Sequence, residues 1–304
     1  INNNTLSLHK TQFLRQPEII DTSLNEAATM VRELLFLSLK RRLRRLQVNS
    51  VAVSFSGGLD SSLIAKAIEM LGVKVILYSV GLDGAHDIEA AENSASALGL
   101  PLQIRIISFD EVESYIFRVI YAIEESNVMK IGVGIPLYAV SELVNKDKMK
   151  VVLTGQGSDE LFAGYDKYLK LLVNQGYGQL QNELWKDLTQ MYHVNLQRDD
   201  AVAMANSVKF ICPLLDLDLV NTAMSLPPQL KVEGSSDFLR KRVLRTVAQN
   251  LGLPECIVNR PKKSVQYGSG SDKAIRKFAK KKGFKHTKEF LNSVFQYIFP
   301  TQLA

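Results

Sequence analysis

Short apolar runs alternate with helical patterns in the first half of the chain, and this alternation constrains the fold more than any other feature. Strands of a buried sheet are predicted from four runs rich in valine, isoleucine and leucine, at residues 51–55, 73–80, 102–107 and 150–153. Two of the intervening helical patterns end at Gly72 and Gly99, as glycine C-caps would. Strands joined by helices predict right-handed βαβ units, and therefore an α/β fold with a parallel sheet. Ligands bind outside the carboxyl ends of such strands, so the loops after the first, second and fourth runs are candidate sites.

The segments on either side of this region are predicted to be helical. Before the first strand, Ser23 and Glu26 have the spacing of a capping box that begins a helix. After about Tyr165 the strand pattern stops. Helices are predicted over residues 169–208, 215–225, 238–251 and 273–295. We therefore expect a lead-in segment over residues 1–20, one domain over 21–270 that is helical after about residue 166, and a basic helical tail over 271–304.

Composition narrows the class of protein. With 46% hydrophobic and 22% charged residues, the 304-residue chain is neither disordered nor collagen-like. The apolar runs are far short of a membrane span. Two cysteines, Cys212 and Cys256, are too few for a disulfide scaffold, so we expect reduced thiols and a cytoplasmic protein. The chain begins at Ile1, which indicates a processed, truncated or incomplete start.

A glycine-rich loop follows the first predicted strand directly. Its sequence is Ser-Gly-Gly-Leu-Asp-Ser-Ser, residues 56–62. Gly57 and Gly58 have no Cβ, so the backbone can pass close to a bulky anion, and the N–H groups at the start of the following helix can bind it. Ser56, Ser61 and Ser62 add hydroxyl groups. Asp60 would repel phosphates unless Mg²⁺ lies between them, so the loop predicts a site for a phosphate group together with Mg²⁺.

This loop resembles the pyrophosphate-binding loop of the N-type ATP pyrophosphatases, which cleave ATP between the α and β phosphates. A second block, Val-Val-Leu-Thr-Gly-Gln-Gly-Ser-Asp-Glu-Leu-Phe-Ala-Gly-Tyr at residues 151–165, resembles the signature of the asparagine synthetase family within that superfamily. Further matches to the family are Cys-Pro-Leu-Leu-Asp at 212–216, Leu-Pro-Pro-Gln-Leu-Lys at 226–231, Arg-Val-Leu-Arg at 242–245, Leu-Pro at 253–254 and Arg-Pro-Lys-Lys at 260–263.

The resemblance implies a fold, an activity and a set of site residues. The fold is the parallel-sheet N-type ATP pyrophosphatase (adenine nucleotide alpha hydrolase-like) fold with a helical C-terminal part. The activity is an AMP-forming ligase that uses ATP and Mg²⁺ to adenylate aspartate or a related carboxylate, which ammonia then converts to the amide. Asp60 and Asp159 would share the Mg²⁺ ion, and Lys262 would stabilise charge on the transferring groups. The nucleotide would lie along Ser54, Phe55, Ser56, Gly57, Gly58, Asp60, Ser61, Ser62, Val80, Gly81, Thr154 and Gly155.

Three departures from the family pattern concern the acceptor and the source of ammonia. Gln156 stands where the family has a catalytic glutamate, and an amide cannot act as a general base. Residues 129–135, Met-Lys-Ile-Gly-Val-Gly-Ile, replace the arginine and small polar residues of the family, although Lys130 could take part. Too few residues precede Val51 for the family's glutaminase domain. Ammonia would then enter directly or come from a separate glutaminase domain or subunit. Alternatively, the chain is a fragment of a longer protein.

Two other functions remain open from the sequence. RNA modification by the same adenylation chemistry would use the basic helices, although solubilising surface charge explains the tail of the chain as well. The chain has no zinc knuckle and no Cys-x-x-Cys for thiolation. A non-catalytic ATP-binding relative, with acceptor chemistry lost, is favoured by Gln156.

Overall fold

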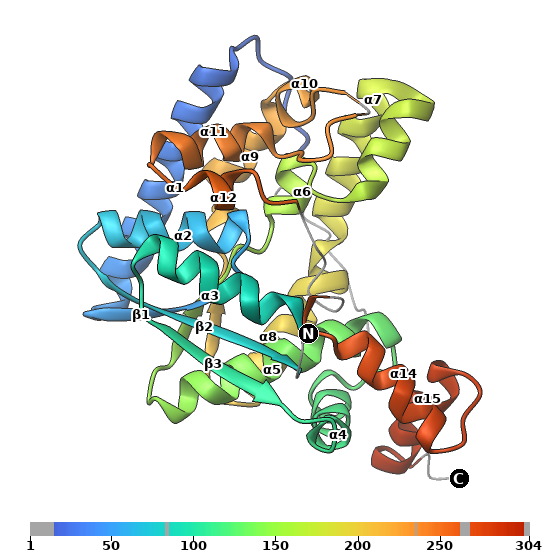
Figure 1. The fold of residues 1–304 in the computed structure, drawn as a ribbon. Helices are drawn as coiled ribbons and strands as arrows, with labels where there is room; N and C mark the ends of the chain where they lie inside the picture. The colour runs from blue at the N-terminus through green and yellow to red at the C-terminus, as the bar shows by residue number, and fades with distance from the viewer. Residues whose placement is uncertain (1–14, 83–84, 235, 262–267, 301–304) are drawn as a thin grey trace, which may run out of the picture.

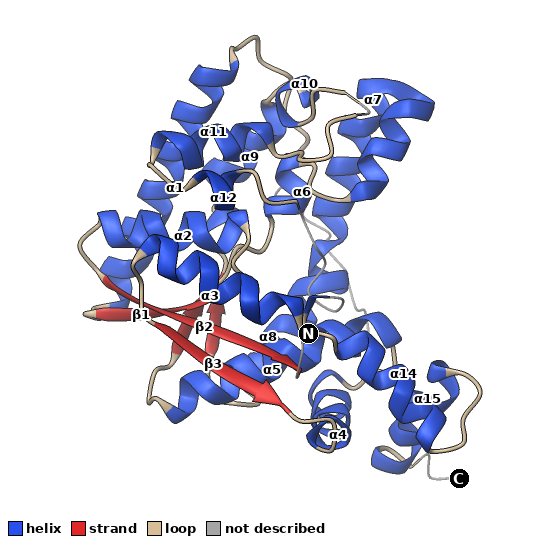
Figure 2. Cartoon of the chain, viewed as in Figure 1, coloured by secondary structure: helices blue, strands red, loops and turns tan. Residues whose placement is uncertain are grey.

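A five-stranded parallel sheet forms the centre of the protein in the computed structural model, which describes residues 15–82, 85–234, 236–261 and 268–300. The strands are β1 (Ser50–Ser54), β2 (Lys74–Leu82), β3 (Leu102–Ile107), β4 (Val151–Leu153) and β5 (Lys209–Ile211). Their order is β3-β2-β1-β4-β5, and every neighbouring pair is parallel. Figure 2 shows the sheet lying between two sets of helices. The predicted α/β fold with a parallel sheet is confirmed.

Each face of the sheet is covered by its own helices and its own apolar core. One face packs against α1 (Leu24–Leu46), α2 (Leu59–Met70), α3 (His86–Leu98), α7 (Asp166–Met191), α9 (Leu217–Ser225), α11 (Arg242–Asn250) and α12 (Glu255–Val258). The other packs against α4 (Glu111–Ile123), α5 (Val128–Lys146), α8 (Gln197–Met204), α14 (Ser271–Lys281) and α15 (Thr287–Ile298). Alternation along β1 explains the division, because Val51 and Val53 join the first core and Ala52 joins the second.

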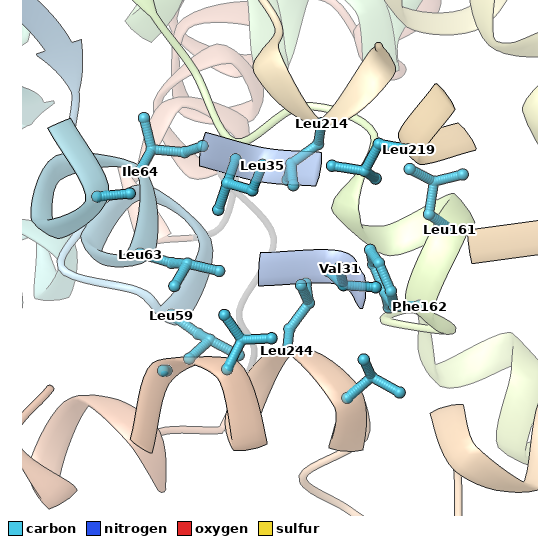
Figure 3. Close-up of a cluster of buried hydrophobic side chains, with 14 of the residues drawn as sticks. Val31, Leu35, Leu59, Leu63, Ile64, Leu161, Phe162, Leu214, Leu219 and Leu244 are labelled. Atoms are coloured by element: carbon cyan, nitrogen blue, oxygen red, sulfur yellow. The ribbon is translucent and has the colours of Figure 1, made fainter. Parts of the chain in front are cut away.

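The remaining short elements are α6 (Ser158–Phe162), α10 (Pro228–Lys231), a π-helical turn at Tyr192–Leu196 and a 3₁₀ turn at Pro213–Leu215. Figure 3 shows Val31 and Leu35 of α1 between apolar side chains of α2 and those of α6. All of these side chains are buried, and α1 begins with the predicted capping box of Ser23 and Glu26. Helix α1 therefore fixes α2 and α6 relative to each other.

The C-terminal half departs from the predicted all-helical pattern. Strand β5 lies within it and pairs with β4, so the prediction that strands stop after about Tyr165 is wrong. Three residues are too few for a period of two to be visible in the sequence. The helix predicted over 169–208 is interrupted, since Gly176 has a φ of 75° inside α7 and a π-helical turn separates α7 from α8. The helix predicted over 273–295 is two helices, divided near Gly283, whose φ is 84°.

Helix α5 begins earlier than the helix that the sequence predicts near residues 136–145, which would start at Pro136. The helix begins at Val128, and Pro136 lies in its interior. Proline has no N–H, so the carbonyl of Gly132, four residues earlier, loses its helical partner. The hydroxyl of Ser271 donates to that carbonyl at 2.5 Å. The start of α14 is thus attached to the proline site of α5.

Among the residues that the structure describes, one helix, α5, is long and apolar enough to cross a membrane by length and composition alone. Half of its most apolar window is buried inside the protein, and the helix contributes Ile131, Ile135 and Ala139 to the core beneath the sheet. A core helix passes the same test, so this finding is weak evidence for a membrane span.

Candidate nucleotide-binding site

The candidate site lies where the connections from β1 and β4 leave the carboxyl edge of the sheet. These two strands are neighbours, whereas β2 and β3 continue the sheet on the other side of β1. The order of strands therefore reverses between β1 and β4, and open parallel sheets bind ligands at such a point. The loop with Asp60 follows β1, and the block with Asp159 follows β4. The predicted proximity of these two segments is confirmed.

The loop at residues 56–62 is held tightly against α3. Gly57 has a φ of 68°, and a Cβ there would lie 2.3 Å from the carbonyl oxygen of Ala90. Ser94 of α3 donates its hydroxyl to the Gly57 carbonyl at 2.9 Å. Gly58 is the N-cap of α2, whose first turn contains Asp60 and Ser61. Only glycine fits at position 57, and the N-terminal end of α2, which carries free N–H groups and partial positive charge, follows the loop directly.

The side chains of Asp60 and Asp159 are joined by a buried lysine. The ammonium of Lys241 lies 2.6 Å from Oδ2 of Asp60 and 2.7 Å from Oδ1 of Asp159. It also donates to the hydroxyl of Ser158 at 2.9 Å, so all three of its N–H groups have acceptors. Burial alone would lower the pKa of Lys241, but the charges of Asp159 and Asp60 outweigh it and raise that pKa. Lys241 is therefore a fixed cation between two carboxylates.

The backbone that presents Lys241 has an uncommon conformation. Arg240 and Lys241 have φ values of 55° and 54°, in the left-handed region that residues with side chains seldom adopt. Arg245 stabilises this turn, because its Nε donates to the carbonyl of Arg240 at 2.7 Å. Such conformations persist where the surrounding structure enforces them, and often at functional sites.

Two glycines allow these charged groups to approach each other. A Cβ on Gly155 would lie 2.6 Å from the Cβ of Asp60. A Cβ on Gly164 would lie 1.9 Å from Oδ1 of Asp159 and 2.3 Å from Cε of Lys241. Any side chain at either position would displace the pair of carboxylates, so both glycines are required by packing.

The oxygens at this site suit a hard cation. Oδ1 of Asp60 and Oγ of Ser62 are buried and have no hydrogen-bond partner among the described residues. Magnesium is bound in proteins through one or two carboxylates, with phosphates and water completing its shell. Within the described part of the chain there is no group of three or more histidine, cysteine or acidic side chains that could hold a metal by itself. Two carboxylates beside a glycine-rich loop fit magnesium bound together with a nucleotide, and that binding remains a prediction.

Gln156 makes a contact that the sequence did not predict. Its Nε2 donates to Oδ2 of Asp199 at 2.5 Å, and Arg198 holds the other oxygen of Asp199 at 2.6 Å. Asp199 and Arg198 are both buried in α8. Burial raises the pKa of Asp199, while the charge of Arg198 and the bond from Gln156 oppose that rise. Nearby, Glu160 accepts hydrogen bonds from Tyr165 at 2.7 Å and from Asn195 at 3.0 Å.

The other predicted residues lie at the expected edge of the sheet. Ser54 ends β1, and Val80 and Gly81 lie near the end of β2. Thr154 follows β4, where its N–H donates to the carbonyl of Ile211 in β5 at 2.9 Å. Lys262 lies outside the described residues. That Ser54, Val80, Gly81, Thr154 and Lys262 contact a nucleotide remains a prediction.

Four side chains that the structure brings to this region have no role assigned from the sequence. Lys241 directly precedes the Arg-Val-Leu-Arg run at 242–245, so its position beside a family match was the available signal. Asp199 and Arg198 carried no signal, because the sequence shows only charged residues in a predicted helix. Arg260 was quoted in a motif without a role, and its guanidinium donates to the Gly57 carbonyl at 3.4 Å.

Comparisons with known proteins agree with these motifs. The asparagine synthase family model matches residues 30–180 and 172–297. A protein of Methanocaldococcus jannaschii, provisionally named a glutamine-hydrolysing asparagine synthetase, is 42% identical over 90% of this chain and 55% of its own length. The glutamine-hydrolysing asparagine synthetase of Sandersonia aurantiaca is 30% identical over 72% of this chain and 44% of its own.

Among solved structures, NMN synthetase from Francisella tularensis has a TM-score of 0.44 and 13% identity, covering 91% of this chain and 93% of that one. A likeness at this level says nothing about function. The chain spans about half the length of the curated relatives it matches. The extent of the family match and the two glycine-rich blocks that meet at Lys241 lead to one conclusion: this chain belongs to the asparagine synthase family.

Proposed function

We propose that this protein is an ATP-dependent amide-forming ligase that adenylates a carboxylate with release of pyrophosphate. The observation that carries the proposal is the convergence of Asp60 and Asp159 on Lys241, beside a glycine loop at the reversal point of a parallel sheet. Family membership favours the same chemistry. Aspartate or a related carboxylate is the proposed acceptor, and ammonia is the proposed nucleophile.

The chain's own residues supply binding and charge. The N–H groups at the start of α2 and the hydroxyls of the loop would bind the pyrophosphate end of ATP. Asp60 and Asp159 would hold Mg²⁺, which when bound neutralises charge on the phosphate oxygens. Lys241 keeps the two carboxylates in place, and Arg260 adds a positive charge beside the loop. Lys262 is proposed to stabilise charge on the transferring groups.

The balance of the reaction defines the expected products. An acceptor carboxylate oxygen attacks the α phosphorus of ATP, and pyrophosphate leaves. Ammonia then attacks the acyl carbon, loses a proton and displaces AMP, which keeps the oxygen that came from the carboxylate. Because Gln156 cannot accept that proton, another base takes it.

The source of ammonia and the cellular setting also belong to the proposal. Glutamine-hydrolysing asparagine synthetases are the named relatives of this chain, and it spans about half their length. We propose that ammonia comes from a separate glutaminase domain or subunit, or from solution. We propose a cytoplasmic enzyme of amino-acid biosynthesis.

Nucleotide analysis after incubation with ATP, Mg²⁺, an ammonium salt and single amino acids tests this function. AMP and pyrophosphate formed in equal amounts, dependent on one carboxylate, are expected. Asp60→Asn and Asp159→Asn should each lower the rate by at least about 100-fold, since both remove charge at the phosphates. Asp110→Asn is the matched control, because its side chain is 92% exposed. ATP binding without AMP formation for any acceptor would favour a non-catalytic relative.

RNA modification is a second candidate, and one observation favours it. The segment at 129–135, which departs from the family's acceptor pattern, lies in α5, and its Gly132 carbonyl is bound by Ser271 at the start of the basic tail. A polyanionic acceptor held by that tail would reach this side of the site. AMP formation that depends on tRNA and not on amino acids would replace the first proposal with this one.

A further inference from the structure

The net charge of the protein is concentrated in one helical hairpin. We define the basic hairpin as residues 271–298, which comprise α14, α15 and the turn between them. It carries eight lysines and arginines against two acidic residues, an excess of six that equals the net charge of the whole chain. The preceding 270 residues therefore carry equal numbers of basic and acidic side chains. Charge needed only for solubility would not be expected to gather in one element.

The inner face of the hairpin is fixed to the protein. Ile275 and Phe278 of α14 are buried, and the ring of Phe278 lies 5.3 Å from that of Phe109. Lys282 forms an ion pair with Glu113 of α4 at 2.8 Å. Figure 1 shows α14 and α15 beside α4, projecting from one end of the molecule. The orientation of the hairpin is therefore set by packing.

The outer face of the hairpin is basic and exposed. Lys273, Arg276, Lys277 and Lys280 are exposed and follow the i, i+3, i+4, i+7 spacing of one helix face. Within the described residues, no ion pair is formed by Lys273, Lys280, Lys285 or Lys288. Tyr297 of α15 is 78% exposed and touches Phe117 only edge-on.

This surface suits a nucleic acid better than a protein. Lysine is depleted in protein–protein interfaces, whereas nucleic-acid interfaces are strongly positive. Lysines contact phosphates without reading sequence. An exposed aromatic ring stacks on unpaired bases, which RNA presents in its loops and single strands.

The hairpin begins at the same sheet edge as the nucleotide site. The N–H of Leu82, at the end of β2, donates to the carbonyl of Ser269 at 2.9 Å, and Ser271 binds Gly132 of α5. We propose that the outer face of the basic hairpin is a docking surface for the phosphate backbone of single-stranded RNA, independent of sequence. This proposed RNA binding is a function beyond the ligase activity, and it does not depend on that activity.

Fluorescence anisotropy with a labelled oligouridine RNA of about 20 nucleotides tests the proposal. The hairpin variant changes four exposed cations to glutamate, namely Lys273, Lys280, Lys285 and Lys288. The control variant makes the same change at four exposed cations elsewhere, namely Lys40, Arg44, Arg45 and Lys74. Both variants alter net charge equally, so only the position of the charge differs.

The wild type should bind in low salt, and the hairpin variant should bind at least about tenfold more weakly, with the slope of log affinity against log salt reduced by about 3. The control variant should lose less than about threefold. Should the glutamate variant fail to fold, judged by its melting curve, glutamine at the same four positions replaces it.

Three results would overturn the proposal: no binding by the wild type, equal loss in both variants, or retained binding in the hairpin variant. Tighter binding of a matched single-stranded DNA or of duplex RNA would overturn the assignment to single-stranded RNA. Displacement of the RNA by polyglutamate at equal charge concentration would point instead to an acidic protein partner.

Discussion

The side-chain amide of Gln156 donates to Asp199 at 2.5 Å. Asp199 is buried and paired with Arg198, so it is an acceptor, and the nitrogen of Gln156 must face it. The amide oxygen then points away from Asp199. Position 156 therefore offers an acceptor oxygen without a charge, in place of the family's carboxylate.

Gln156→Glu alone should fail to restore a base. The new carboxylate would face Asp199, and two carboxylates in a buried site raise each other's pKa until one holds a proton. We expect a loss of about 2 kcal/mol in the free energy of unfolding and no gain in amide formation. Urea unfolding and product analysis measure the two effects.

The double variant Gln156→Glu with Asp199→Asn is the matched test of that explanation. An asparagine at 199 can donate to a glutamate at 156, so the contact returns with its polarity reversed. Stability should recover to within about 1 kcal/mol of the wild type, and amide formation should rise above that of the single variant. Equal stability of the single and double variants would show that the contact does not govern position 156.

Lys241→Met should reveal Asp60 and Asp159 as a cation site. Removing the ammonium leaves two close carboxylates, and loss of one partner of a buried ion pair costs about 3 kcal/mol. Added Mg²⁺ should then raise the melting temperature of the variant more than that of the wild type, because the ion can occupy the charge position that Lys241 left. Lys74→Met serves as the exposed control. If Mg²⁺ raises the melting temperatures of the wild type, Lys241→Met and Lys74→Met equally, Asp60 and Asp159 are not a cation site.

Gly155→Ala tests the close packing of the two blocks. Its Cβ would lie 2.6 Å from that of Asp60, so the loop or the aspartate must move. We expect a loss of about 2 kcal/mol in unfolding free energy together with reduced ATP binding. Gly178→Ala is the control, since a Cβ there meets nothing within 4 Å and alanine favours its helix. Unchanged ATP binding in Gly155→Ala would show that the loop tolerates the displacement.

Much of this site could be predicted from the sequence. Asp60 and Asp159 lie in the segments that follow two apolar strands, and the family resemblance implied that they share one ion. The order of the sheet, with β1 beside β4, is what brings those two segments together. Lys241 lies 181 residues from Asp60, and no local period reports so distant a contact. The three residues of β5 were too few to be recognised, and Pro136 suggested a helix start because prolines favour first turns.

Lys231 should make stability depend on pH. It is fully buried without a hydrogen-bond partner among the described residues, and burial lowers its pKa to about 7. The unfolded chain has a lysine pKa near about 10.4, so between these values the unfolded state binds more protons and stability rises with pH. Lysine 231 should contribute about 1 kcal/mol per pH unit in this window.

We isolate that contribution by measuring the unfolding free energy of the wild type and of Lys231→Met over a range of about three pH units, from about pH 7 to about pH 10. The difference in unfolding free energy between the two proteins should shrink as pH rises, because folding the wild type requires its lysine to lose a proton, and the cost of that loss falls with pH. Lys74→Met provides the exposed comparison. Parallel curves for wild type and Lys231→Met would mean that Lys231 keeps its ordinary pKa.

The proposed reaction at this site joins an acceptor carboxylate to the α phosphate of ATP. Aspartate labelled with ¹⁸O in its side-chain carboxylate, incubated with the protein, ATP, Mg²⁺ and ammonium, tests it directly. We expect one labelled oxygen to appear in the phosphate of AMP for each amide formed, and we expect Asp60→Asn to abolish the transfer. AMP without label, or ADP and phosphate as the products, would contradict it.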